Sequence, residues 1–102
     1  MASRLELHEE FCTLLESRKV YFQPPASVKL EYDCIKYSLS GIATRHANNE
    51  NYMATKRYEV IVVTHDPDSP IPDKILKHFR MCRFDRAYVA DNLNHFVFTL
   101  YY

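Results

Sequence analysis

Apolar and polar side chains alternate with a period of two along the last stretch of the chain. Every second position there is apolar or aromatic: Phe96, Phe98, Leu100 and Tyr102. A second alternating run precedes this one, and Asp91, Asn92 and Asn94 are typical of a turn between the two. The pattern predicts a β-hairpin over residues 84–102. Because its end is apolar, we expect either the rest of the domain or a neighbouring chain to cover it.

A helical period marks the start of the chain. Ser3 and Glu6 have the spacing of a capping box. Apolar side chains follow at i, i+4, i+7 and i+8, namely Leu7, Phe11, Leu14 and Leu15. This spacing predicts an amphipathic helix over residues 4–17. Residues 20–22 are extended and end before Pro24 and Pro25. Because proline has no backbone N–H, we expect this short strand at a sheet edge.

The middle of the chain combines strand signals with one long polar stretch. The apolar alternation that starts at Val28 changes phase near Asp33 and Cys34, which predicts a bulge or a break there. Residues 40–51 have little apolar content and contain Gly41 and three asparagines, so we expect one long loop. The run from 58 to 64 is rich in β-branched residues and predicts a central strand that is covered on both sides.

A second helix is predicted after a turn rich in Asp, Pro and Ser. Asp68 or Ser69 can serve as its N-cap, and Ile75, Leu76 and Phe79 give it a short apolar face. The predicted order is helix, three strands, helix, two strands. This order indicates a single α+β domain over residues 1–102. We expect an antiparallel sheet of four to five strands with two helices packed on one face.

Composition and charge narrow the function classes. The 102 residues include 13 basic and 13 acidic side chains, which cancel. This balance argues against a nucleic-acid binder that works by bulk charge, and we expect no sequence-specific nucleic-acid binding. No apolar stretch has the length of a signal peptide or a membrane span. We therefore expect a protein that is made in a cytoplasm and does not act at a membrane.

Residues that could carry chemistry are scattered. The five histidines, His8, His46, His65, His78 and His95, share no metal-ligand spacing. The three cysteines, Cys12, Cys34 and Cys82, contain no C-x-x-C pair, so we expect reduced thiols in or near the core, with an intersubunit disulfide as the alternative. A single glycine leaves no glycine-rich loop for a phosphate. We expect no catalytic, metal or cofactor site and no enzyme.

Three segments of the chain carry a resemblance to a known group of proteins. They are Lys-Arg-Tyr-Glu-Val at 56–60, Asp-Pro-Asp-Ser at 66–69 with Ile-Pro-Asp-Lys at 71–74, and Phe-Asp-Arg-Ala-Tyr-Val-Ala-Asp-Asn-Leu-Asn-His at 84–95. Together they cover about half of the chain and resemble a small protein encoded in the head-tail joining region of tailed-phage genomes. The predicted order of elements is similar to that of tail terminator proteins.

The resemblance implies a structural role. Tail terminators form a sixfold ring that caps the tail tube and docks it to the head connector, and no catalytic residues belong to the family. It implies a homohexameric ring in the virion, at the phage neck, assembled in the host cytoplasm. Its partners would be the tail tube protein and the head-tail connector protein. The alternatives are a head completion or connector adaptor protein of the neck, and a small cytoplasmic binding module that recognises a peptide or ligand through its sheet.

A closed ring requires each subunit to present two different, complementary faces. For one face we expect residues of the fourth strand: Arg83, Asp85, Arg86 and Tyr88. For the other we expect acids on the outer side of the first helix: Glu9, Glu10 and Glu16. The loop at 40–51 matches the position of an extended loop in such rings, where it would contact the tube or a neighbour through Arg45, Asn48, Asn49, Asn51 and Tyr52.

Overall fold

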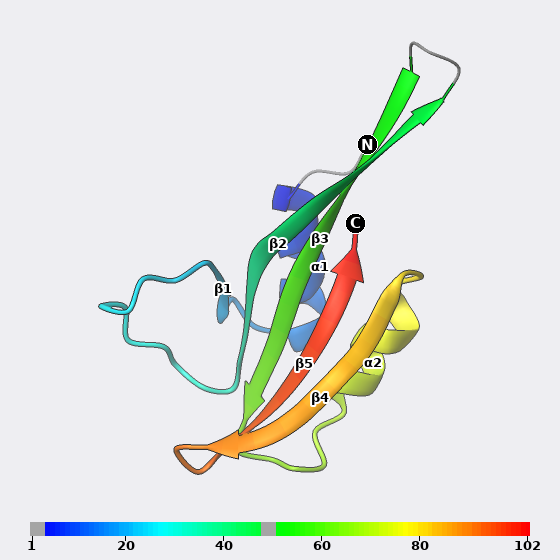
Figure 1. Cartoon of the computed structure of the whole chain (residues 1–102). Coiled ribbons are helices and arrows are strands. Elements are labelled where there is room, and N and C mark those ends of the chain that lie inside the picture. The colour runs from blue at the N-terminus through cyan, green and yellow to red at the C-terminus, as the bar shows by residue number, and fades with distance from the viewer. Residues whose placement is uncertain (1–3, 48–50) are drawn as a thin grey trace.

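One mixed β-sheet with two helices on one of its faces makes up the computed structural model, which describes residues 4–47 and 51–102 (Figure 1). The elements are α1 (Arg4–Leu15), β1 (Val20–Phe22), β2 (Cys34–Ala47), β3 (Asn51–Thr64), α2 (Ile71–His78), β4 (Cys82–Ala90) and β5 (Leu93–Tyr101). The strand order across the sheet is β1-β2-β3-β5-β4. The predicted α+β class, two helices and order of elements are confirmed.

The sheet differs from the prediction in one pairing. β1 runs parallel to β2, with Val20 opposite Ile35, whereas the other pairs are antiparallel. The sheet is therefore mixed, because the connection over residues 23–33 is long enough to bring the chain back to the same end of the sheet. The edge position of β1 is confirmed. Beyond its end, Gln23 continues the ladder: its N–H donates to the Tyr37 carbonyl (2.9 Å), and its Oε1 accepts from the Leu39 N–H (3.1 Å).

The core lies between the helices and one face of the sheet. The largest fully buried side chains on this face include Leu7, Phe11, Ile35, Tyr37, Val60, Val62, Ile75, Phe98 and Leu100. Apolar spacing in the helices and alternation in the strands place these side chains on facing surfaces. On the opposite, open face of the sheet a smaller cluster contains Cys34, Val63 and Leu93.

Tyr37 occupies the centre of this core. Its ring packs against Phe11 (5.1 Å between centroids) and Phe22 (5.0 Å). Its hydroxyl forms a hydrogen bond with Nδ1 of His8 (2.8 Å) and accepts one from Nη1 of Arg4 (3.3 Å). Burial is the main reason that the pKa of Tyr37 is raised. A buried hydroxyl without hydrogen-bond partners would lower the stability of the fold, so the bonds from Tyr37 to His8 and Arg4 hold α1 in place on β2.

The C-terminal hairpin forms as predicted. β4 and β5 pair in antiparallel fashion, and Ala90 lies opposite Leu93 across a two-residue turn. The turn residues Asp91 and Asn92 have positive φ values of 53° and 63°, a conformation that tight hairpin turns require and that Asp and Asn tolerate. The central position of residues 58–64 in the sheet is also confirmed, since β3 lies between β2 and β5.

The predicted long loop at residues 40–51 is wrong. β2 continues to Ala47 and β3 begins at Asn51, so these residues belong to a hairpin; residues 48–50 lie outside the described part. We call the segments 41–47 and 51–57 the arm. It projects past both helices and past the end of β5 (Figure 1). Backbone pairing forms the arm in spite of its low apolar content, which sequence patterns register as a loop.

A bulge marks the base of the arm. The register of β2 against β3 shifts between Leu39 and Gly41. A Cβ atom on Gly41 would lie 2.8 Å from Nη2 of Arg57, which itself donates to the Ser40 carbonyl (2.9 Å). Gly41 therefore leaves room for the Arg57 guanidinium rather than forming a loop.

Smaller differences concern the ends of elements. The phase change near Asp33 and Cys34 is a break, because residues 28–33 are irregular and β2 begins at Cys34. α1 ends at Leu15, two residues before the predicted end, and Glu16 follows with a positive φ of 58°. The N-cap of α2 is Pro70, not Asp68 or Ser69.

Paired phenylalanines on neighbouring strands offer a test of the core. Phe98 is fully buried on β5, whereas its partner Phe84 on β4 is 44% exposed. We expect Phe98→Ala to lower the free energy of unfolding by about 3–5 kcal/mol, the cost of an emptied aromatic site. Phe84→Ala is the matched control and should cost less than half as much. Urea titrations would measure both, and equal losses would contradict this description of the core.

Candidate assembly surfaces

Strand β4 forms one edge of the sheet and carries the four residues expected at the first face. Residues 83–89 are all exposed. Nε of Arg83 donates to Oδ1 of Asp85 (2.9 Å), and the Thr99 hydroxyl donates to the other carboxylate oxygen. The hydrogen bond from Thr99, and then that from Arg83, lowers the pKa of Asp85. Asp85 is thus engaged within the subunit, whereas the Arg83 side chain stays 73% exposed.

Arg86 and Tyr88 continue this surface on the open face of the sheet. The Arg86 guanidinium carbon lies 5.9 Å from the centroid of the Tyr88 ring. The Tyr88 ring stacks on His95 of β5, with 4.6 Å between centroids and 9° between planes. The contacts hold a cationic and an aromatic side chain side by side on an exposed edge, a combination that is enriched where proteins bind one another.

The acids of α1 do not form one outer face. Glu9 is exposed and accepts two hydrogen bonds from Arg18 (2.7 and 3.1 Å), which lower its pKa. Glu16 lies 3.6 Å from Lys74 of α2 and is also exposed. Both therefore lie on the surface as predicted, although each already has a partner in its own subunit.

Glu10 is a correction to the predicted set. Its Oε1 lies 2.7 Å from Nε2 of His78, and its Oε2 accepts a hydrogen bond from the Tyr102 hydroxyl. It therefore points to the contact of α1 with α2 and the end of the chain, not to the outer side of α1. Burial and the Glu10 carboxylate raise the pKa of Tyr102. This cluster fixes the last residue to both helices.

The residues expected to contact the tube or a neighbour lie on the arm. Arg45 is in β2, and Asn51 and Tyr52 are in β3. Asn48 and Asn49 lie outside the described residues. Within the described part of the chain, the arm from Ile42 onward has no neighbour on the outer edge of β2 and no helix over it. The structure thus brings the three described residues to one projecting element, far from β4.

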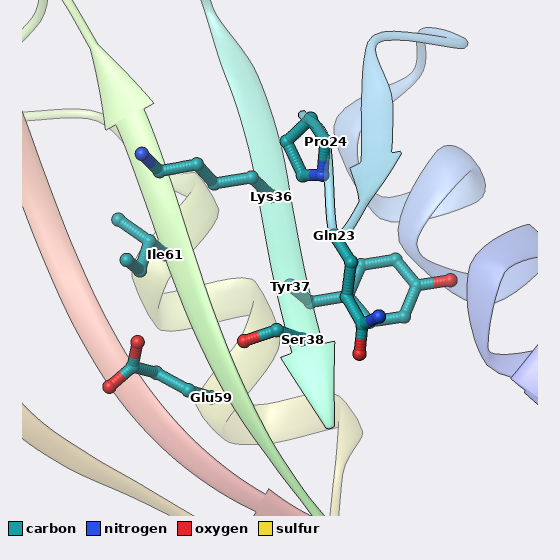
Figure 2. Close-up of a pocket in the computed structure, with 7 residues that line it drawn as sticks. All are labelled: Gln23, Pro24, Lys36, Tyr37, Ser38, Glu59 and Ile61. Atoms are coloured by element: carbon teal, nitrogen blue, oxygen red, sulfur yellow. The ribbon is translucent and has the colours of Figure 1, made fainter. Parts of the chain in front are cut away.

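A shallow hollow lies on the open face of the sheet beside Gln23 and Pro24 (Figure 2). Lys36 of β2 and Glu59 and Ile61 of β3 project into it from neighbouring strands. Its volume is about 270 Å³. Ligand sites usually enclose roughly 300–1,000 Å³ and most of their ligand. This hollow is smaller than most ligand sites, whereas other hollows of the surface, beside Pro25 and Tyr32 and between Leu15 and Lys74, measure about 430 and 360 Å³.

In the part of the chain that the structure describes, no group of three His, Cys, Asp or Glu side chains could hold a metal ion. The three thiols are free. Cys12 and Cys34 are buried and Cys82 is half-buried. Burial raises the pKa of both Cys34 and Cys82 to about 11. Their thiols therefore stay protonated and poorly nucleophilic near neutral pH.

Sequence reasoning missed the apolar side chains at the two open edges. Val89 on β4 is 69% exposed, and Ile42 at the base of the arm is 56% exposed. Val89 follows Tyr88 in a run that reads simply as strand, and Ile42 lies in the segment predicted as loop. Alternation alone does not say which strands lie at an edge, so no pattern in the sequence singles out these two residues.

Comparisons with protein-family models, curated proteins and solved structures gave no match. Of the helices that the structure describes, none is long and apolar enough to cross a membrane.

The burial of the thiols leads to a direct test. At pH 7.5 we expect a small maleimide to label the folded protein far more slowly than the urea-unfolded protein, in which all three thiols react. The native rate should rise with pH over the range in which the maleimide is stable, because the raised pKa leaves little reactive thiolate at neutral pH. Fast labelling of one thiol in the folded protein, followed by mass spectrometry, would contradict the described burial.

Proposed function

We propose that this protein is a structural subunit of a tailed phage, most simply a tail terminator. It would form a homohexameric ring at the head-proximal end of the tail tube. The ring would end tail assembly and join the tail to the head connector. The observation that carries this proposal is that the sheet has two different open sides. Strand β4 is one side, and the arm with β1 and α1 is the other (Figure 1).

Two different sides suit a ring better than a twofold dimer. A heterologous contact joins the β4 side of one copy to the opposite side of the next, and repetition closes a ring when the rotation allows it. The β4 side carries Arg83 and Arg86, and the α1 side carries Glu9, whereas Glu16 faces Lys74 of α2. Exposed charge pairs contribute about 0–1 kcal/mol each, so they would set orientation while apolar area stabilises the contact.

The projecting arm supports a second part of the proposal. A two-stranded ribbon is marginally stable by itself, because neither face is covered. A neighbour in the ring or the tail tube would supply that cover. The α+β order and the three sequence segments at 56–60, 66–74 and 84–95 agree with this role, and the neutral net charge of the chain suits a contact between copies.

Charge reversal on β4 tests the ring. We expect Arg83→Glu with Arg86→Glu to weaken assembly, and Glu9→Lys to restore it in part, because the contact would regain opposite charges. Light scattering coupled to gel filtration would give the size of each variant at several salt concentrations. Thermal unfolding should change little, since the two arginines are exposed.

The matched control reverses Lys77 alone, an exposed basic residue near the end of α2, and is compared with the single Arg86→Glu variant. It changes the net charge equally but should leave assembly unchanged. A wild-type protein that stays monomeric at every concentration would overturn the ring and favour a binding module. Co-sedimentation of rings with tail tubes, rather than with purified connectors, would separate the terminator from the neck adaptor.

Hydrogen exchange on the arm provides a further prediction. In the free subunit we expect its backbone amides to exchange quickly, because a two-stranded ribbon opens easily. In the assembled ring or on tail tubes, the amides of residues 42–47 and 51–56 should be protected. The strands β3 and β5 around Val60 and Phe98 are the internal reference and should be protected in both states. Equal arm protection in free and assembled protein would rule out a role for the arm in assembly.

A further inference from the structure

We propose that the copies in the ring join edge to edge: β4 of one copy adds to the arm portion of β2 in the next copy, so that one continuous sheet crosses the subunit contact. This inference rests on the proposed ring and places backbone and apolar groups, rather than Arg86 and Glu9, at the contact, because Arg86 extends from the open face of the sheet and α1 lies on the other face.

The β4 edge offers unpaired backbone groups over a regular stretch. In an antiparallel ladder, alternate residues bond to the partner strand. Ala90 and Leu93 form the hydrogen-bonded pair beside the turn. Counting back from this pair, Tyr88 and Arg86 also bond to β5, so the N–H and C=O groups of Ala87 and Val89 point outward. Natural sheet edges are usually protected by lysine, proline, bulges or covering elements. The bulge next to Asp85 interrupts only the first half of β4, and residues 86–90 contain neither lysine nor proline.

The β2 edge is open only along the arm. β1 covers residues 35–37, and Gln23 occupies the N–H of Leu39. The shift in register between Leu39 and Gly41 changes which residues face outward. Ile42 and Thr44 therefore present their backbone groups to the open side of β2. No strand or helix in the described part of the chain covers them.

The two edges match in direction. β4 is antiparallel to β5, β5 to β3, and β3 to β2. β4 is therefore antiparallel to β2 within one subunit, and it stays so when a second copy continues the sheet. The new ladder would be antiparallel, with the outward-facing Val89 opposite Ile42 and Ala87 opposite Thr44. Closure of such a sheet requires the strands to tilt relative to the ring axis and the register to stagger by a fixed amount.

The two edges also match in their exposed apolar side chains. Val89 and Ile42 both extend from the helix-covered face of the sheet. When the bulge in β4 is counted, Val89 lies on the same face as Phe84, which is opposite Phe98. When the bulge in β2 is counted, Ile42 lies on the same face as Leu39, which is opposite Tyr58. They are 69% and 56% exposed. In a continuous sheet the two side chains would cover each other. A twofold pairing of β4 with β4 would instead leave both Ile42 edges open and would end at a dimer.

Chemical crosslinking tests the contact. We would place Cys at Val89, at Ile42, or at both, and treat the assembled protein with a short bifunctional maleimide. The wild-type protein is the control for its own buried thiols. We expect covalent dimers from a mixture of the two single variants. The double variant should give a ladder that ends at the size of the ring, and each single variant alone should give neither.

A proline variant tests the backbone component. Val89→Pro removes an outward-facing N–H without removing a bond to β5, so the subunit should still fold. The concentration for half-assembly should rise about tenfold or more, whereas Val89→Thr, which keeps the donor and a β-branched side chain, should be much less affected. If Val89→Pro proves unfolded by circular dichroism, the crosslinking result decides.

The outcomes separate this inference from the ring itself. Rings of the expected size without a Val89 to Ile42 crosslink would overturn the edge pairing and leave the proposed function standing. Efficient crosslinking of the Val89→Cys variant alone would show β4 pairing with itself and also overturn the edge pairing. A crosslinked ladder on open filaments would support the edge pairing and overturn the closed ring. A monomer without crosslinks would overturn both.

Discussion

The strands are much longer than the helices, and this difference in length determines which part of the sheet is left uncovered. β2 and β3 each have 14 residues, whereas α1 has 12 and α2 has 8. At about 3.3 Å per strand residue and about 1.5 Å per helix residue, the strands span more than twice the length of either helix. The helices can therefore cover only the lower part of the sheet. The rest of β2 and β3 forms the arm, and the longest dimension of the chain is 51 Å.

Polar contacts inside the subunit fix this arrangement. The Tyr37 hydroxyl with His8 and Arg4 ties α1 to β2, and Glu10 with His78 and Tyr102 ties both helices to the end of the chain. Each contact joins segments far apart in the sequence. Because the buried hydroxyl of Tyr37 would be costly without partners, α1 has little freedom to slide toward the arm and cover it. The exposure of the arm is thus a consequence of how the core is held together.

Sequence patterns predicted the parts of the fold in which local signals and burial agree. The helix of Leu7 and Phe11 and the hairpin around Asp91 and Asn92 show a clear period, and the central strand of Val60 and Val62 is an unbroken β-branched run; the predicted cap Ser3 lies outside the described residues. The arm was missed because its strands gain stability from backbone pairing, which apolar alternation does not register. The parallel pairing of β1 was missed because it depends on the path of residues 23–33, where no periodic pattern exists.

The candidate surfaces were predictable only in part, and for a related reason. Charged residues on β4 could be named from the sequence, and the structure places Arg83, Asp85, Arg86 and Tyr88 on that one edge. The sequence could not show that Glu10 is engaged inside the subunit whereas Glu9 is exposed. Both lie on α1, and only the position of α2 decides which of them faces His78.

The edge strand β4 has little protection against pairing with other chains, and a partner strand in a neighbouring copy would account for this exposure. A monomer with exposed Val89 on a regular edge and exposed Ile42 on an uncovered ribbon would risk uncontrolled pairing with other chains. Closure into the proposed ring would remove both edges at once, because each copy would use its β4 to cover the β2 of a neighbour. The bulge and charges near Asp85 would then prevent pairing along the first half of β4 and limit contact to the register in which the apolar side chains meet. In this arrangement the same features that make the isolated subunit vulnerable would make its assembly specific.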